Sequence, residues 1–132
     1  MKDIYVYPAI FDFADDGISI EFPDLPGCFP CADTVEEAVN NAREAMMLHL
    51  YGMEQDNEDI PEPTAINKIE TEKGQSLILV DAFMPPFREK QRTKFVKKTL
   101  SIPSWLNAEA ERCGINFSAA LQETLKERLN VR

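Results

Sequence analysis

The hydrophobic and polar positions follow different periods along the chain, and each period predicts one kind of element. Residues 4–11 are a dense run of β-branched, aromatic and apolar side chains, which is typical of a strand buried on both faces or nearly so. After a turn signal at residues 15–17, apolar side chains alternate with polar ones over residues 18–22, as in a half-buried strand. A third, short strand is expected near residues 28–32.

A helical period follows these strands. Thr34 and Glu37 match a capping box, in which each side chain binds a backbone N–H group of the first turn. Apolar side chains then recur on one helical face, at Val35, Ala38, Val39, Ala42 and Met46. We predict that this helix stops at Gly52, that residues 54–65 form a loop and that residues 75–83 form a last strand. The order of elements is therefore β-β-β-α-β.

The C-terminal part of the chain follows a second plan, in which a short strand leads into two helices. The alternation over residues 95–102 gives one apolar face and one polar face, and the polar face consists of Lys97, Thr99 and Ser101. Pro103 suits the first turn of a helix, where no backbone N–H is needed, and Gly114 suits its left-handed cap. This first helix places Cys113 at a core spacing. A second helix begins at Asn116 or Ser118.

A strand with two helices is too small to bury a core of its own. Two copies resolve this if they pair their strands antiparallel and pack their four helices together. We therefore expect a homodimer through this strand, with a tetramer as the larger alternative. The paired ribbon then presents Lys97, Thr99 and Ser101 twice, and a two-stranded ribbon can enter the major groove of DNA. We therefore expect these three side chains to reach base edges.

Phosphate contacts are expected at two further places. The backbone N–H groups that open the second helix, near Asn116 and Phe117, suit an anion. Arg92 and Lys94, on the arm before the strand, add an attraction that is independent of DNA sequence and is screened by salt.

The charge divides the chain in the same way. The 132 residues include 23 acidic and 14 basic side chains, and the net charge of −9 alone argues against a nucleic-acid partner. Residues 1–87, however, carry −14 and residues 88–132 carry +5. Because the change follows Pro85-Pro86, we predict a boundary within residues 84–92 and two domains, 1–87 and 88–132. The acidic domain suits a basic protein and the basic domain suits DNA.

The residues of both parts resemble known families. The C-terminal part resembles the ribbon-helix-helix repressors through Lys97–Pro103 and Gly114–Ser118. The N-terminal part resembles the HicB antitoxins through four segments, Asp16–Ile18, Phe22–Cys28, Asp33–Ala38 and Asn41–Ala45. Together these likenesses cover nearly the whole chain, and the second segment with the capped helix after it is the more specific signal.

The resemblance implies an α+β protein in which a partial RNase H-like domain precedes a dimeric ribbon-helix-helix domain. It implies the antitoxin of a type II toxin–antitoxin system, which neutralises a small basic, mRNA-cleaving HicA-like toxin by binding it directly. It also implies repression of its own operon through operator DNA. By analogy, the three polar strand residues read bases, and Asn116 and Phe117 bind phosphate.

The acidic residues are the candidate contacts for such a toxin. We single out Asp15, Asp16, Glu21 and Asp24. The acidic loop from Glu54 to Glu62 is an alternative location, and self-repulsion that keeps dimers soluble is an alternative use of the charge.

Catalysis and metal binding are not expected. The first predicted strand of a nuclease of the RNase H type would hold a carboxylate, and residues 4–11 hold none. Cys28 and Cys31 have the C-x-x-C spacing, but too few further ligands exist for zinc, and we assign the pair to a loop or strand. We expect no cofactor.

Two broader questions stay open at the level of sequence. The chain lacks a membrane span and a charged-then-apolar leader, so we expect a cytoplasmic protein. The alternative function is a ribbon-helix-helix transcriptional regulator with a ligand-sensing N-terminal domain. A neighbouring reading frame for a small basic protein would favour the antitoxin.

Overall fold

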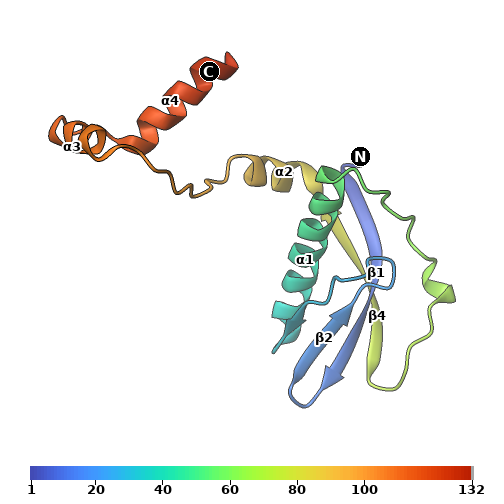
Figure 1. Cartoon of the computed structure of the whole chain (residues 1–132). Coiled ribbons are helices and arrows are strands. Elements are labelled where there is room, and N and C mark those ends of the chain that lie inside the picture. Colours follow the sequence, from blue (N-terminus) through green and yellow to red (C-terminus); the bar gives the residue numbers. More distant parts are fainter. Residues whose placement is uncertain (132) are drawn as a thin grey trace. The chain divides into compact units, whose positions relative to one another are not determined.

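The computed structural model describes residues 1–131, which form two compact units, Met1–Lys94 and a second unit that begins at Phe95 (Figure 1). The division differs from the expected one between residues 87 and 88, because a helix covers the predicted boundary. Each unit is described by itself below.

The first unit is built on one antiparallel sheet of four strands in the order β3-β2-β1-β4. The strands are β1 (Ile4–Ala14), β2 (Gly17–Glu21), β3 (Cys31–Ala32) and β4 (Gln75–Phe83). β1 and β2 form a hairpin, and β4 returns after the helix to pair with β1 along its whole length. The predicted β-β-β-α-β order and the mixed α+β class are confirmed.

The helix α1 (Val35–Gln55) begins as the sequence predicts, with the Thr34 hydroxyl accepting from the Glu37 N–H at 3.2 Å. It does not stop at Gly52 but continues for one more turn. A glycine inside a helix costs only about 1 kcal/mol, and here Tyr51 and Met53 pack against the core on either side of it. Packing therefore outweighs the local preference of glycine to end the helix.

The core lies between α1 and one face of the sheet. The sheet contributes Tyr5, Tyr7, Ala9, Phe11, Ile18, Ile20, Val80 and Ala82, and the helix contributes Ala38, Ala42, Met46 and Leu50. The helix contacts the sheet along this i, i+4 row, so Val35 and Val39 lie outside the contact and are exposed, contrary to the predicted stripe. Loop residues Phe22, Leu25 and Cys28 close the core beyond the end of β2.

A short helix that the sequence did not predict, α2 (Met84–Arg92), follows β4 directly. Pro85 and Pro86, which had indicated a break, lie in its first turn, where a missing N–H leaves no hydrogen bond unmade. Met84 is buried in the core and Phe87 stacks edge-on against Tyr51 of α1, with the ring centroids 6.0 Å apart. α2 therefore belongs to the first unit.

The second unit contains α3 (Ser104–Arg112) and α4 (Phe117–Leu129). Both helices match the prediction, and Gly114 between them has a φ of +69°. Residues 95–102 form no strand in the isolated chain, because a strand needs a partner strand and a single copy offers none. No side chain of residues 95–131 is buried, and Cys113 is exposed rather than buried.

Candidate protein-binding and DNA-binding surfaces

The face of the sheet that α1 does not cover carries exposed apolar side chains. We call this surface the open sheet face and define it by the outward residues of β1 and β4, namely Ile4, Val6, Leu79 and Phe83. Each of these side chains is between 41% and 59% exposed. Ile4 lies directly across from Phe83, so the apolar side chains of the two strands are neighbours. An exposed apolar cluster on a sheet is typical of a protein-binding surface.

The dense apolar sequence of residues 4–11 had predicted a strand buried on both faces, and this prediction is wrong for Ile4 and Val6. Only every second residue of β1 faces α1, since side chains alternate along a strand. Pro8, on the same second face, is buried, so that face is uncovered at Ile4 and Val6 and not along the whole strand. The amino-acid types of this strand could not show where the covering ends.

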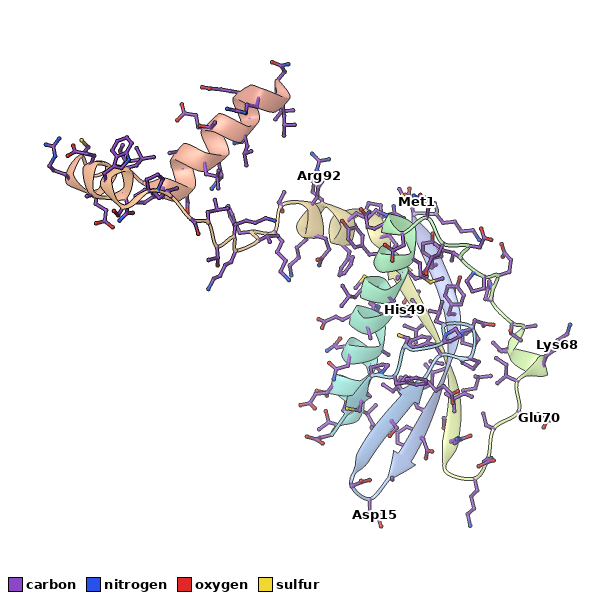
Figure 2. The ribbon with its side chains drawn as sticks, viewed as in Figure 1. Met1, Asp15, His49, Lys68, Glu70 and Arg92 are labelled. Carbon is purple, nitrogen blue, oxygen red and sulfur yellow. The ribbon has the colours of Figure 1, made fainter. Side chains whose placement is uncertain are left out.

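Acidic side chains border the open sheet face. Asp12, Glu21 and Asp81 point to the same side as Val6, because they occupy the matching positions of their strands. All three are exposed. Asp15 and Asp16 lie in the β1–β2 turn, with Asp15 at its tip (Figure 2). The predicted residues Asp15 and Asp16 thus lie at the turn end of the hairpin, whereas Glu21 lies at the other end of β2, opposite Ile10. All three are exposed.

Asp24, the fourth predicted contact, has a different role in the structure. Its Oδ2 accepts from the Thr64 N–H at 2.9 Å and its Oδ1 accepts from the Thr64 hydroxyl at 2.5 Å. The carboxylate therefore fastens the loop after α1, which includes the short helix η1 (Ile66–Lys68), to the loop after β2. Sequence gave no signal for this pairing across 40 residues.

One ion pair on the open edge of the sheet affects a pKa. Arg43 of α1 donates from Nη2 to Asp81 Oδ1 at 2.9 Å and from Nε to the Asp81 carbonyl at 3.1 Å. The guanidinium hydrogen bond lowers the pKa of the Asp81 carboxyl below its ordinary value. Asp81 therefore keeps its negative charge under mildly acidic conditions.

The cysteines do not form a reactive pair. Burial raises the pKa of the Cys28 thiol to about 11, while Cys31 is exposed at the start of β3. Both thiols are free. Within residues 1–131, no group of three or more histidine, cysteine, aspartate or glutamate side chains is arranged to hold a metal ion.

The predicted DNA-binding residues fall in both units. Lys97, Thr99 and Ser101 are exposed on the segment before α3. Arg92 lies at the end of α2, where it projects into solvent (Figure 2), and Lys94 closes the first unit. The basic arm before residue 95 is therefore an extension of the first unit.

The start of α4 has the geometry expected of an anion site. Asn116 is the N-cap, and its Oδ1 accepts from the Ala119 N–H at 3.1 Å. Because the side chain already occupies one donor of the first turn, the backbone N–H groups of Phe117 and Ser118 are left to meet an external acceptor. Asn116 and Phe117 are therefore the N-cap and the first residue of α4.

An open apolar groove of about 980 Å³ runs through the second unit. It is lined on its apolar side by Leu100, Ile102, Leu106, Ala110, Ile115 and Leu121. All six side chains are exposed or half-buried. The second unit therefore lacks a closed core as a single copy.

Comparison with known protein families assigns the chain to one of them. The model of a family described as the HicB-like antitoxin of bacterial toxin–antitoxin systems matches residues 7–123. The chain belongs to the HicB-like antitoxin family. None of the helices described for residues 1–131 is both long and apolar enough to cross a membrane.

Individual relatives agree with this assignment to the HicB-like family. The chain is similar to an uncharacterised 14.9 kDa protein of Haemophilus phage HP1, with 40% identity over 63 residues, 48% of this chain and 47% of the relative. It is similar to antitoxin HicB 2 of Photorhabdus laumondii, with 30% identity over 76 residues, 58% of this chain and 50% of the relative. The chain thus spans about half the length of these two curated relatives.

A solved structure shares the fold of this HicB-like chain. It comes from a toxin–antitoxin complex of Streptococcus pneumoniae, with a TM-score of 0.61 and 20% identity. The similarity covers 95% of this chain and 99% of the other.

Proposed function

We propose that the protein is the antitoxin of a type II toxin–antitoxin pair and also the repressor of its own operon, acting in the cytoplasm. The first unit, a partial RNase H-like domain, binds a small basic HicA-like toxin that cleaves mRNA. It blocks the RNA-binding surface of the toxin by contact alone, with no chemistry of its own. The second unit, one half of a ribbon-helix-helix dimer, binds operator DNA.

The open sheet face carries the toxin-binding part of this proposal. Exposed apolar side chains supply contact area, and the acidic side chains around them complement a basic surface. The first unit as the structure divides it, residues 1–94, has a net charge of −11, so association with a basic protein is favoured at long range too. Family membership and the fold shared with a chain of a toxin–antitoxin complex agree with this use.

A co-expression test distinguishes the two candidate toxin-binding locations, the acidic residues around the open sheet face and the acidic loop from Glu54 to Glu62. The product of the adjacent reading frame for a small basic protein is co-expressed with the tagged antitoxin, and growth rescue and pull-down are measured. Asp12→Lys with Glu21→Lys, which reverses charge on the open sheet face, should abolish rescue. Glu58→Lys with Asp59→Lys, which makes the same change of charge in the loop after α1, should preserve it. Loss with the loop variant alone would place the contact in the loop.

The apolar groove and the anion site of α4 carry the DNA-binding part. Two copies that pair residues 95–102 antiparallel would close the groove and present Lys97, Thr99 and Ser101 on a two-stranded ribbon. Asn116 would orient the first turn of α4, whose N–H groups would bind phosphate.

Operator binding can be separated from toxin binding by mutation. Lys97→Ala with Thr99→Ala should abolish binding to the promoter DNA of the operon and leave toxin rescue intact. Lys68→Ala, which removes a cation from η1 of the first unit, serves as the control and should bind the promoter like wild type. Loss of both activities in the first variant would show that the two units do not act separately.

A further inference from the structure

An exposed phenylalanine lies in the segment between β2 and β3. Phe29 is 67% exposed and is the most exposed aromatic residue of the first unit. The chain is held on both sides of it, because Cys28 is buried in the core and the Pro30 carbonyl accepts from the Ile20 N–H at 2.9 Å. Phe29 is therefore presented to solvent on a fixed segment, so that binding through it loses little loop entropy.

Phe29 lines an open pocket of about 280 Å³, which we call the Phe29 pocket. Residues of three strands line the rest of it, namely Ile10, Asp12, Ser19, Glu21 and Gln75. These five side chains share the side of the open sheet face, since Ile10 lies directly across from Glu21 and Asp12 lies directly across from both Ser19 and Gln75. The pocket therefore joins an aromatic side chain from a loop to the acidic border of the open sheet face.

The two carboxylates of the Phe29 pocket have no cation of their own. Asp12 and Glu21 occupy diagonal positions on the paired strands β1 and β2. Among residues 1–131, neither takes part in an ion pair, and no basic side chain lines the pocket. Gln75 Nε2 donates to Asp12 Oδ2 at 3.5 Å, which is a long and therefore weak hydrogen bond. A cation that enters the pocket thus meets two uncompensated charges beside an aromatic ring, and all three groups attract it.

We propose that the Phe29 pocket receives one arginine side chain of the toxin, with its guanidinium against the Phe29 ring and between the carboxylates of Asp12 and Glu21. The inference rests on the proposed function and names the contact that anchors the toxin. Arginine is favoured over lysine because its planar group stacks on an aromatic ring and carries five N–H donors, against three for an ammonium. Oxygen acceptors for these donors come from Asp12, Ser19, Glu21 and Gln75.

The rest of the open sheet face lacks this combination of groups. The four apolar residues that define the face carry no charge, and Asp81, which lies between two of them on β4, is already paired with Arg43. A basic side chain therefore gains little there, whereas apolar side chains of a partner would be buried. The Phe29 pocket is thus the place on this side of the sheet where a single cation is selected.

The affinity of the full chain for the toxin tests the proposal, with the purified small basic product of the adjacent reading frame as the probe in calorimetric titrations. Phe29→Ala and Phe29→Leu should each weaken binding about tenfold, since leucine keeps apolar bulk but has no π face for a cation. Phe13→Leu is the matched control and should bind like wild type, because Phe13 is also exposed but lies opposite the core residue Ile18, on the other face of the sheet. Circular dichroism verifies that each variant is folded. A folded Phe29→Leu protein that binds as tightly as wild type overturns the proposal.

An alanine scan of the toxin supplies a second measurement. Each arginine and lysine of the toxin is replaced by alanine, and the loss of affinity is measured with wild-type antitoxin and with Phe29→Leu. One arginine should show a large loss with the wild type and a much smaller loss with Phe29→Leu. If every basic residue of the toxin acts independently of Phe29, or if the coupled residue is a lysine, the assignment of the pocket to arginine is wrong. A wild-type protein that does not bind the toxin at all would instead contradict the proposed function, and this inference with it, so the two failures are distinguished.

Discussion

Arg88 of α2 forms a two-pronged ion pair with Glu54 near the end of α1. Nε lies 3.0 Å from Oε1 and Nη2 lies 2.7 Å from Oε2. The Glu54 side chain is 2% exposed and the Arg88 side chain 17%. The Tyr5 hydroxyl donates to the same carboxylate at 3.1 Å, so the pair connects α1, α2 and β1. The hydrogen bond with Glu54 also raises the pKa of Arg88 above its ordinary value.

Removing Arg88 should destabilise the first unit. Arg88→Met leaves the Glu54 carboxylate buried without its cation and should lower the free energy of unfolding by about 3 kcal/mol. Arg43→Met, which breaks the exposed pair with Asp81, should cost no more than about 1 kcal/mol. Urea unfolding followed by circular dichroism measures both.

The double variant sharpens this test. Arg88→Met with Glu54→Met removes both charges and should recover much of the lost stability, since no charge is then left unpaired. The loss of unfolding free energy in the double variant is compared with the sum of the losses in Arg88→Met and Glu54→Met. If the two are equal, packing rather than charge pairing holds α2 in place.

Two glycines of the first unit should respond in opposite directions to alanine. Gly17 has a φ of +142°, and a Cβ there would lie 3.0 Å from the Ala32 carbonyl oxygen. Gly17→Ala should therefore cost about 1–3 kcal/mol. A Cβ at Gly52 meets nothing within 4 Å, so Gly52→Ala should stabilise α1 by roughly 0.5–1 kcal/mol. Thermal melting of both variants checks the sign of each effect.

Tyr7 should make the stability of the first unit depend on pH in the alkaline range. Its hydroxyl donates to the Pro61 carbonyl, and burial raises its pKa from 10.0 to about 12. The folded state thus retains a proton that the unfolded state releases. The stabilisation is complete below pH 10 and is lost as the pH rises toward 12.

Urea midpoints across that range measure the effect of Tyr7. Tyr7→Phe is the matched control, because it cannot ionise, and its midpoint should fall less steeply with pH. An identical slope for the two proteins would contradict the assignment to Tyr7.

The thiols should differ in reactivity. In a Cys113→Ser background, a thiol reagent at mildly alkaline pH should modify exposed Cys31 quickly. Cys28 is buried and its pKa is raised to about 11, so it should react only after unfolding. Rapid modification of both thiols in the native protein would show that the loop after β2 opens readily.

Periodicity predicted the elements whose stability comes from local spacing and from one buried face. β1, β2, β4, α1, α3 and α4 all lie where alternation, capping residues and helical stripes indicate them. The helix α2 was missed because its place depends on the contact between Arg88 and Glu54, which lie 34 residues apart. Paired prolines are compatible with both a break and a first helical turn, and distant contacts decide between them, those of Met84 with the core, Phe87 with Tyr51 and Arg88 with Glu54.

The site residues show the same limit. The acidic positions on the turn and on β2 are exposed as predicted, since nothing distant engages them. The Asp24 carboxylate accepts hydrogen bonds from Thr64, 40 residues away. The exposed apolar residues of the open sheet face were missed because hydrophobic residues on a strand do not reveal which face has a covering layer.

Because α2 belongs to the first unit, it determines at which residue the first unit can be fused to another DNA-binding domain. A fusion protein that keeps residues 1–87 and replaces the rest would lose Arg88, the partner of Glu54, and would interrupt α2 after Phe87. A hybrid made at residue 95 would keep the fold of the first unit and carry Lys90, Arg92 and Lys94 with it. These three basic residues would then directly precede any DNA-binding domain fused after residue 94. They would add a salt-sensitive attraction to nucleic acid that does not depend on its sequence.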